Sequence, residues 1–368
     1  MDPELVRFLY PLVATANTTR IGAVDDIGTA IALSRFGFVH GSNTVILAPE
    51  NQPALSAAAS TLVHFPLDGP VLLNPVGSLD QRVRQEIVRL APAGEGSPAQ
   101  VFLVGPFSPA VQAAIQSLGL TVQRVGSSDP IQTAVAAAEI RLSVEATRNV
   151  TLVSLDDLVW GILAAGWTAH MGDPLLYVHA NSIPPATAQF IRNHQPNVYL
   201  MGPPAVISRA VLDQVRSLTS GYVARITGFS PAEVAVNFSR FFAPTNSLYG
   251  WGRWSPNAGQ AFSFLSTQFT HLDLVAPAGS CLSHIGKHTP LLYVEPNSVP
   301  DATRDYLMSV NPGPFLVQEE PPFMHGFVVG NQDVIALHVQ LELNDLLTRG
   351  EHMPMSANRE VGEPAPES

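Results

Sequence analysis

The segment Pro174-Leu175-Leu176-Tyr177-Val178 returns later in the chain as Pro290-Leu291-Leu292-Tyr293-Val294. Each copy is followed, at the same spacing, by Asn-Ser, a proline and Ala-Thr, over residues 181–187 and 297–303. Agreement over this length within one chain indicates an internal duplication. The chain is therefore interpreted as a set of repeats, and the other predictions depend on their number and size.

An arginine marks the same point in three copies of the repeat. It precedes an isoleucine or valine, and nine residues later a Thr or Val begins a short helix-like segment; the three positions are Arg20, Arg124 and Arg225. The arginines lie roughly a hundred residues apart, which is the size of a small domain and not of a solenoid repeat. The sequence therefore predicts three small domains.

A strand-like segment that ends in Gly-Pro provides a third marker. It occurs at 101–106 and at 198–203, each time before a helix-like stretch. The third copy is expected at 314–320, where Pro-Phe-Leu-Val is followed by Gln-Glu-Glu and not by glycine. We therefore expect the last repeat to have diverged at this end.

Each repeat alternates apolar runs with helix-like segments. Runs such as 45–48 and 70–73 are typical of parallel strands that are buried on both faces. Prolines and Asp80 begin the helices between the strands. The pattern predicts an α/β fold of three tandem units, each with a parallel sheet between layers of helices. By the same order, repeat 2 should contain a helix over 159–171, and repeat 3 a strand over 271–275 before a Gly/Ala-rich helix.

The markers divide the chain into five parts. Residues 1–17 form a lead-in, 18–122 the first repeat, 123–223 the second, 224–347 the third, and 348–368 a polar tail rich in proline and glutamate. The composition of the tail is typical of disordered segments. The third repeat also contains an insert at 249–256 that has no counterpart in the other two.

The composition excludes several classes of protein. With 46% hydrophobic and 13% charged residues over 368 positions, the sequence predicts a globular chain with proper cores. Its net charge of −11 argues against nucleic acid as a partner. The single cysteine, Cys281, excludes an intramolecular disulfide framework.

No apolar run approaches the roughly 18 residues needed to cross a bilayer, so we expect no membrane span. The apolar stretch at 5–13 follows Asp2 and Glu4 and contains Pro11, and it therefore lacks the basic start and uninterrupted core of a signal peptide. On this ground the chain acts in the cytoplasm, or its export signal is of another kind or has been removed.

The order of these segments resembles that of the bacterial cell wall-binding repeat, type 2 (CWB2). In that family an Arg-Ile turn and a Thr-Ala-x-Ala helix precede an apolar strand, an Asn-Phe-Pro helix opening, a Pro-hydrophobic-Leu-Leu strand and a strand ending in Val-Gly. The last four match 45–48, 51–59, 70–73 and 102–105, and the resemblance extends over 18–345. It implies three flavodoxin-like units around a pseudo-threefold axis, a noncatalytic module at the cell surface, and attachment to anionic wall polymers.

The chain departs from the CWB2 pattern at charged positions. After the arginine the family has an acid and then a base. At these two positions this chain has Asp25-Asp26, Asp129-Pro130 and Ser230-Pro231, so the base is missing in all three repeats. A polyanion requires cationic or N–H donors. These losses favour an alternative in which the chain is a degenerate relative, a structural protein that forms homo-oligomers or docks onto a larger particle.

Arg20, Arg124 and Arg225 are the first candidates for an anion-binding site. If they converge near the pseudo-threefold axis, their guanidinium groups can bind phosphate or carboxylate groups. The alternative is structural, with each arginine capping a helix or pairing with an acid of the next repeat. Asn51 and Asp157 are further candidates because each follows a predicted strand, where ligands of parallel sheets bind. A simple turn is the alternative at both positions.

Two clusters in the third repeat allow a functional and a structural interpretation. The insert suits contact with a glycan or a protein, or equally a lid over the core of repeat 3; its candidates are Tyr249, Trp251, Arg253 and Trp254. The spacing of Cys281, His284 and His288 suits zinc. However, Gly286 and Pro290 end that helix early, and the aligned positions of repeat 2 carry no ligands. We therefore predict no metal site.

For catalysis the sequence offers no starting point. It contains no Gly-x-Ser-x-Gly elbow, no Walker loop, no His-Glu-x-x-His and no Gly-x-Gly-x-x-Gly after a strand. We therefore expect a noncatalytic binding or scaffold protein without cofactors, whose partner is an anionic cell-wall polymer or another protein. A small-molecule-binding or hydrolytic α/β protein is the third interpretation, and a deep pocket between repeats would favour it.

Overall fold

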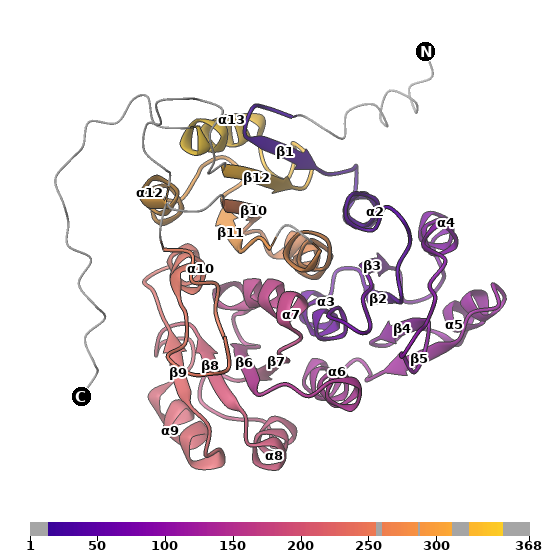
Figure 1. The fold of residues 1–368 in the computed structure, drawn as a ribbon, viewed down its shortest axis with the longest axis horizontal. Helices are drawn as coiled ribbons and strands as arrows, with labels where there is room; N and C mark the ends of the chain where they lie inside the picture. Colours follow the sequence, from indigo (N-terminus) through magenta and orange to yellow (C-terminus); the bar gives the residue numbers. More distant parts are fainter. Residues whose placement is uncertain (1–13, 255–259, 286–287, 311–323, 349–368) are drawn as a thin grey trace.

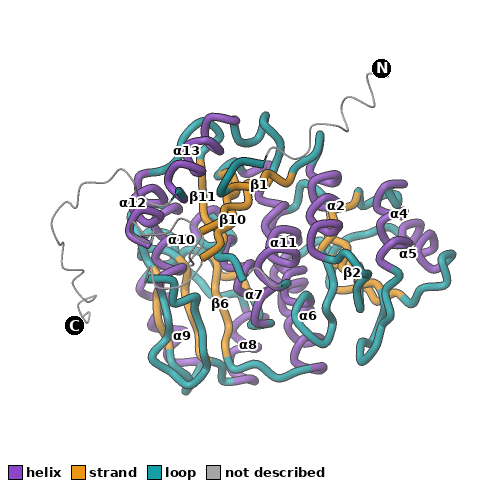
Figure 2. Tube along the Cα trace, turned by 45° about the horizontal axis from the view of Figure 1, so that its top comes forward, coloured by secondary structure: helices purple, strands orange, loops and turns teal. Residues whose placement is uncertain are grey.

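The computed structural model describes residues 14–254, 260–285, 288–310 and 324–348 of the chain. These residues form three four-stranded parallel sheets, with helices packed between and around them (Figures 1 and 2). We denote the sheets with their helices unit 1, unit 2 and unit 3, in chain order. Every sheet has the flavodoxin-like strand order 2-1-3-4. The predicted fold class is therefore confirmed.

The units contain matching elements. Unit 1 contains β2 (Val45–Pro49), β3 (Val71–Asn74), β4 (Val101–Val104) and β5 (Val122–Val125), with α3 (Pro53–Ala59), α4 (Gln81–Leu90) and α5 (Pro109–Gln116). Unit 2 contains β6 (Asn149–Ser154), β7 (Leu175–Val178), β8 (Asn197–Met201) and β9 (Val223–Ile226), with α7 (Ala165–Met171), α8 (Pro185–His194) and α9 (Arg209–Leu218). Unit 3 contains β10 (Gln260–Ser266), β11 (Leu291–Val294) and β12 (Met324–Val329), with α11 (Val275–Ala278), α12 (Asp301–Val310) and α13 (Leu337–Leu347).

The first strand of the chain completes the last sheet. β1 (Thr18–Ile21) pairs in parallel with β12, so that Arg20 lies opposite Val328. Segment 18–122, the first sequence repeat, thus contributes its first strand to unit 3. β5 and β9 occupy the corresponding edge position in units 1 and 2, so β1 gives the third sheet the same strand order as the other two. The pairing of β1 with β12 also joins the two ends of the described chain.

Three connecting helices carry the chain from one unit to the next. They are α2 (Asp26–Gly37), which packs on β3, α6 (Pro130–Val144), which packs on β7, and α10 (Pro231–Arg240), which packs on β11. The side chains of Asp25, Asp129 and Ser230 accept backbone N–H bonds at their starts. In each of the three pairs at which the chain departs from the CWB2 charge pattern, the first residue therefore caps the connecting helix.

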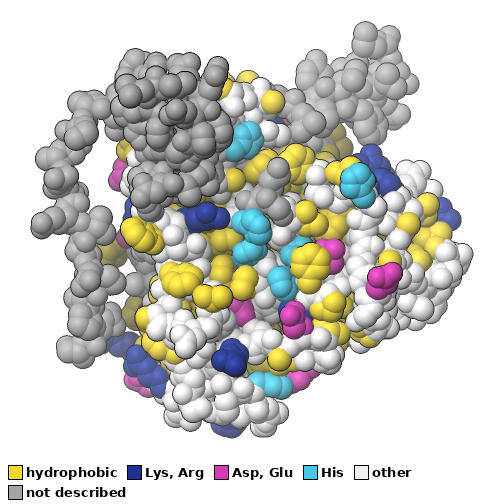
Figure 3. Space-filling model, in the orientation of Figure 1, with side chains coloured by type: hydrophobic (Ala, Val, Ile, Leu, Met, Phe, Trp, Pro, Cys, Tyr) yellow, Lys and Arg dark blue, Asp and Glu magenta, His cyan; other side chains and the backbone are white. Residues whose placement is uncertain are grey.

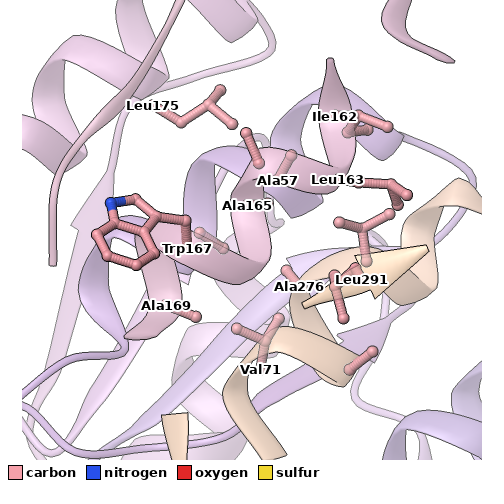
Figure 4. Close-up of a cluster of buried hydrophobic side chains, with 14 of the residues drawn as sticks. Ala57, Val71, Ile162, Leu163, Ala165, Trp167, Ala169, Leu175, Ala276 and Leu291 are labelled. Atoms are coloured by element: carbon pink, nitrogen blue, oxygen red, sulfur yellow. The ribbon is translucent and has the colours of Figure 1, made fainter. Parts of the chain in front are cut away.

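Short central helices from all three units meet at the centre of the molecule. They are α3, α7 and α11, the last continued by the π-helical turn η5 (Gly279–His284) (Figure 1). A Cβ atom on Gly279 would lie 3.2 Å from the Cα of Gly166, and one on Gly166 would lie 2.7 Å from the Cγ of Leu291. Figure 4 shows the surrounding cluster, in which Ala57, Ala165 and Ala276 come from different units. Small residues therefore let these helices pack closely.

The helix predicted over 159–171 is only partly correct. α7 begins at Ala165, and two 3-10 turns, Leu158–Trp160 and Ile162–Ala164, precede it. Gly161 separates these turns because its backbone packs against the sheet, where a Cβ atom would lie 2.7 Å from the Cβ of Met201. Apolar periodicity does not reveal such a contact, since it reports the character of a segment and not its neighbours.

The strand predicted over 271–275 is wrong. Most of this segment belongs to the 3-10 helix Phe269–Leu274, and the strand of unit 3 is β10, which lies earlier in the chain. β10 contains serines at 263 and 266 among its apolar residues and lacks the continuous apolar run found in β2. A short apolar run does not by itself distinguish a strand from a helix.

The third copy of the strand that ends in glycine is β12. Gly330 follows β12 with a φ of +113°, as Gly105 follows β4 at +103° and Gly202 follows β8 at +108°. Glycine adopts this left-handed backbone without the steric cost that a side chain brings. The expected loss of the glycine from repeat 3 is therefore wrong, and the segment 314–320 lies outside the described residues.

In the described parts of the chain, every helix is too short or too polar to cross a membrane.

Candidate functional site

The carboxyl ends of the central strands lie beside the starts of the central helices, where the seams between units open as two shallow pockets. The pocket between units 1 and 2 has a volume of about 290 Å³ and is lined by 51–55, Ser128, Pro130, Leu155 and Leu158. The pocket between units 2 and 3 has a volume of about 390 Å³ and is lined by 155–159, Thr267 and Leu272. Asn51 and Asp157, predicted separately, therefore lie in neighbouring pockets.

Two carboxylates line the pocket between units 2 and 3. Asp157 accepts a hydrogen bond from the indole N–H of Trp160 at 3.1 Å. Asp156 accepts the backbone N–H of Ala180 at 2.8 Å, and its other oxygen lies 2.6 Å from Nδ1 of His179. The amide and then the imidazole lower the pKa of Asp156. Ionised carboxylates only accept hydrogen bonds, so this pocket suits hydroxyl and amino groups better than phosphate.

Asn51 lies in the other pocket, in the turn between β2 and α3. Its φ of +58° falls in the left-handed region, which asparagine adopts more readily than most residues with a side chain. The side chain is exposed. The backbone thus accounts for an asparagine here, and its amide can also donate to a ligand; the binding role of Asn51 and Asp157 stays a prediction.

The third seam, between units 3 and 1, holds a buried acid that the sequence analysis missed. Asp273 is 1% exposed, and its backbone carbonyl accepts a hydrogen bond from Ser56 Oγ of unit 1 at 2.7 Å. Its Oδ1 atom has no hydrogen-bond partner among the described residues. Burial raises the pKa of Asp273 to about 7, and the charge of Asp26 adds to this effect.

The two tyrosines of the duplicated segment occupy matching positions with different partners. The hydroxyl of Tyr177 donates a hydrogen bond across the seam to the carbonyl of Ala54, at 2.6 Å. The hydroxyl of Tyr293 is buried and has no hydrogen-bond partner in the described part of the chain. The repeat therefore provides a matched pair with which to measure one contact between units.

We expect Tyr177→Phe to lower the free energy of unfolding by about 1 kcal/mol, because one buried hydrogen bond between units is lost. Tyr293→Phe removes a buried, unpaired hydroxyl and should leave the stability unchanged or increase it. Urea denaturation of both variants measures the difference. Equal losses in the two variants would contradict a stabilising bond between Tyr177 and Ala54.

The three arginines do not converge. They lie on β1, β5 and β9, the outer edge strands of three separate sheets (Figure 1). Each guanidinium donates to a carbonyl in the turn after the neighbouring strand: Arg20 to Gly330 at 3.0 Å, Arg124 to Phe107, and Arg225 to Gly202 at 2.8 Å. The expected meeting at the axis is wrong, because the repeat places the arginines at the periphery. An anion-binding role for each arginine stays a prediction.

The first aromatic residue of the insert packs on unit 2. Tyr249 is fully buried; its ring stacks on Tyr199 with 3.6 Å between centroids, and its hydroxyl shares a hydrogen bond of 2.6 Å with Thr151. The insert therefore includes a lid, but over unit 2 and not over the core of unit 3 as the structural interpretation expected. Loop length and composition did not indicate which sheet it covers.

Residues 251–254 of the insert lie nearer the surface. Trp251 stacks on His170 with 5.1 Å between ring centroids, and Arg253 donates to the carbonyl of His288 at 3.3 Å. Trp254 is 69% exposed. Of the four predicted contact residues, Trp254 is thus the one whose ring is most available to a partner.

The three candidate zinc ligands face different neighbours. Cys281 is buried beside Gly37, and burial raises the pKa of its thiol to about 12. His284 Nε2 lies 2.9 Å from Asp68 Oδ1, whereas His288 faces His170. Among the residues that the structure describes, no three or more His, Cys, Asp or Glu side chains are gathered to hold a metal ion.

Neither a family model nor a curated protein matches this sequence. Two solved structures are similar in fold. Cwp6 from Clostridium difficile has a TM-score of 0.74 at 16% identity, over 91% of this chain and 48% of that chain. Cwp8 from Clostridium difficile has a TM-score of 0.70 at 15% identity, over 90% of this chain and 52% of that chain. This chain therefore shares its fold with about half the length of Cwp6 and of Cwp8.

Proposed function

We propose that this protein is a noncatalytic module that attaches to polymers of a bacterial cell wall. The main support is the fold that 91% and 90% of the chain share with Cwp6 and Cwp8, both cell wall proteins. The resemblance of the repeats to CWB2 points in the same direction. All three units keep the glycine turn of that repeat, at Gly105, Gly202 and Gly330.

The two seam pockets are the proposed polymer-contact site. They adjoin one another, because Leu155 and Leu158 line both. Their polar side chains include the carboxylates of Asp156 and Asp157 and the amide of Asn51, and the lining contains no lysine or arginine. Contacts in these pockets would therefore be hydrogen bonds to sugar hydroxyl and N–H groups, with the polymer's anionic groups held outside them.

Co-sedimentation of the full chain with bacterial wall sacculi tests the proposal. We expect retention on intact sacculi, loss of retention after acid removal of the anionic polymers, and a weak dependence on salt, because few cationic contacts are available in the pockets. Absence of retention on either preparation would reject wall attachment.

Variants in the two pockets locate the contact. Asp157→Ala and Asn51→Gly should each weaken retention severalfold, and glycine at position 51 preserves the left-handed backbone. Asp213→Ala is the matched control, since this acid has a side chain 70% exposed on α9. Equal retention by all three variants would place the polymer elsewhere on the molecule.

A scaffold function is the second candidate. The stretch 242–254 exposes three large apolar side chains, those of Phe242, Leu248 and Trp254. Exposed apolar side chains within so short a stretch suit contact with another protein. Light scattering distinguishes the two functions, because a scaffold must assemble into oligomers whereas a wall-attachment module can remain a monomer.

A further inference from the structure

Four histidines meet at the C-terminal ends of the central helices, at the other end of these helices from the pockets. His64 follows the 3-10 turn η1 (Ser60–Leu62) of unit 1, His170 lies in the last turn of α7, and His284 and His288 belong to unit 3. Ring centroids are 5.4 Å apart for His64 and His284, and 4.8 Å apart for His170 and His288. We name these four residues the histidine seam. Figure 3 shows histidine side chains near the middle of one face, among hydrophobic ones.

The surroundings of His64, His170 and His288 favour the neutral imidazole. The Nδ1 atom of His64 is buried and has no hydrogen-bond partner among the described residues. The Nδ1 atoms of His170 and His288 lie 3.3 Å apart, so they can share one proton but cannot both carry one without repulsion. Burial lowers the pKa of His64 to about 4 and that of His170 to about 3. It also lowers the pKa of His288.

The charged groups that face the seam do not compensate for added protons. Arg141 and Arg253 lie near it and oppose further positive charge. The acids that face it in the described structure are Asp68 and Glu145, and both are already paired. Asp68 lies 2.9 Å from His284 Nε2, and Glu145 lies 2.5 Å from an Nη atom of Arg141. Protonation of the remaining imidazoles would therefore place like charges at the junction of three units.

We propose that the histidine seam is an acid-sensitive latch: protonation of His64, His170 and His288 drives the C-terminal ends of the central helices apart and loosens the contact between the three units. At neutral pH the same rings pack in edge and stacked contacts and hold the units together. At the pocket end the bond from Tyr177 to Ala54 contains no imidazole. His271 there lies 3.1 Å from Asp26, which raises the pKa of the imidazole, so protonation does not weaken that contact. Acid therefore opens the assembly from one end.

Two tryptophans report the state of the latch. Trp251 stacks on His170, and Trp167 packs on Trp251 with 5.1 Å between ring centroids. Separation of the units would expose these indoles to water. Asp80, which binds Arg82, and Asp156 have pKa values lowered from 3.8, so both stay ionised in the window from about pH 6.5 to 4.5. Asp173 accepts the indole N–H of Trp167 at 2.9 Å, and burial raises its pKa to about 6. Variants that change only the histidines therefore separate their effect from that of Asp173.

Tryptophan emission of the full chain, followed through this window, tests the latch. We expect emission to move to longer wavelength while the far-ultraviolet circular dichroism stays constant. The double variant His64→Gln/His170→Gln should shift the midpoint at least one pH unit lower, and the exposed His338→Gln, on α13, should leave it unchanged. A double variant with the wild-type midpoint would overturn the proposal.

A second measurement uses the natural chain, so its result does not depend on whether a variant folds. Nuclear magnetic resonance titration of ¹³C-labelled histidine in the full chain should show at least two rings that stay neutral well below pH 6.5 and become charged as the tryptophan emission changes. If every ring in the chain titrates near pH 6.5, as free histidine does, the latch is rejected.

Discussion

Replacement of Arg20 by alanine should lower the free energy of unfolding by about 3–5 kcal/mol, because a fully desolvated charged donor is removed and its acceptors stay buried. Arg20 is 1% exposed. Its Nε donates to Gln340 at 2.9 Å, and its Nη1 to the carbonyls of Gly330 at 3.0 Å and Asn331 at 2.9 Å. These bonds join the first strand of the chain to the last unit. Urea denaturation measures the loss.

Arg124→Ala is the matched control for this prediction. Arg124 holds the corresponding place on β5, but it is exposed, and its partners belong to its own unit. We expect it to cost less than about 1 kcal/mol, since exposed polar contacts contribute little. Arg20→Lys should not restore stability, because an ammonium group cannot reproduce the planar fork of donors. Similar losses for Arg20→Ala and Arg124→Ala would contradict the role of Arg20 in joining the chain ends.

Asp273→Asn should stabilise the protein in alkaline solution by up to about 4 kcal/mol, in proportion to a pKa raised by roughly three units. Burial raises the pKa of Asp273 from 3.8 to about 7. The folded state therefore favours the protonated acid. The protonated acid stabilises the fold relative to the ionised acid. This contribution is fully present below pH 4 and is lost as the pH rises through 7. Asparagine resembles the protonated acid in shape and carries no charge, so it removes this loss.

The difference in stability between Asp273→Asn and the natural chain, measured by urea denaturation from pH 4 to 9, checks this prediction. The difference should be near zero at pH 4, grow between pH 5 and 7, and level off above pH 8. The histidine seam acts in the opposite direction, since lowered imidazole pKa values make the chain less stable as the pH falls. A difference that does not vary with pH would mean that Asp273 is ionised without penalty.

Local patterns in the sequence predicted most of the architecture. The duplicated segment at 174–178 and 290–294 and the regular arginines indicated the number and size of the units, because a repeat is visible wherever its residues match. Continuous apolar runs identified β2, β3 and β7 because strands buried on both faces need apolar residues throughout. Asp80 was predicted as a helix cap, and its side chain accepts the backbone N–H of Arg82.

Where local pattern failed, the cause was a neighbour distant in sequence. Gly161 breaks a helical pattern because the adjacent sheet leaves no room for a side chain. Asp273 was hidden because a segment as short as 271–275, with a leucine on each side of the acid, suits either a strand or a helix. The direction of the insert over unit 2 depends on Tyr199 and Thr151, about 50 and 100 residues away from Tyr249.

The sequence by itself thus determined three α/β units with parallel sheets, because alternation, apolar runs and repetition are properties of short segments. Only the tertiary structure decided that β1 joins the sheet of unit 3, that Arg20 is buried while Arg124 is exposed, and that four histidines meet at one seam. Exposure, hydrogen-bond partners and pKa depend on which distant groups displace water from a side chain. Equivalent positions in a repeat therefore acquire different roles once the units pack together.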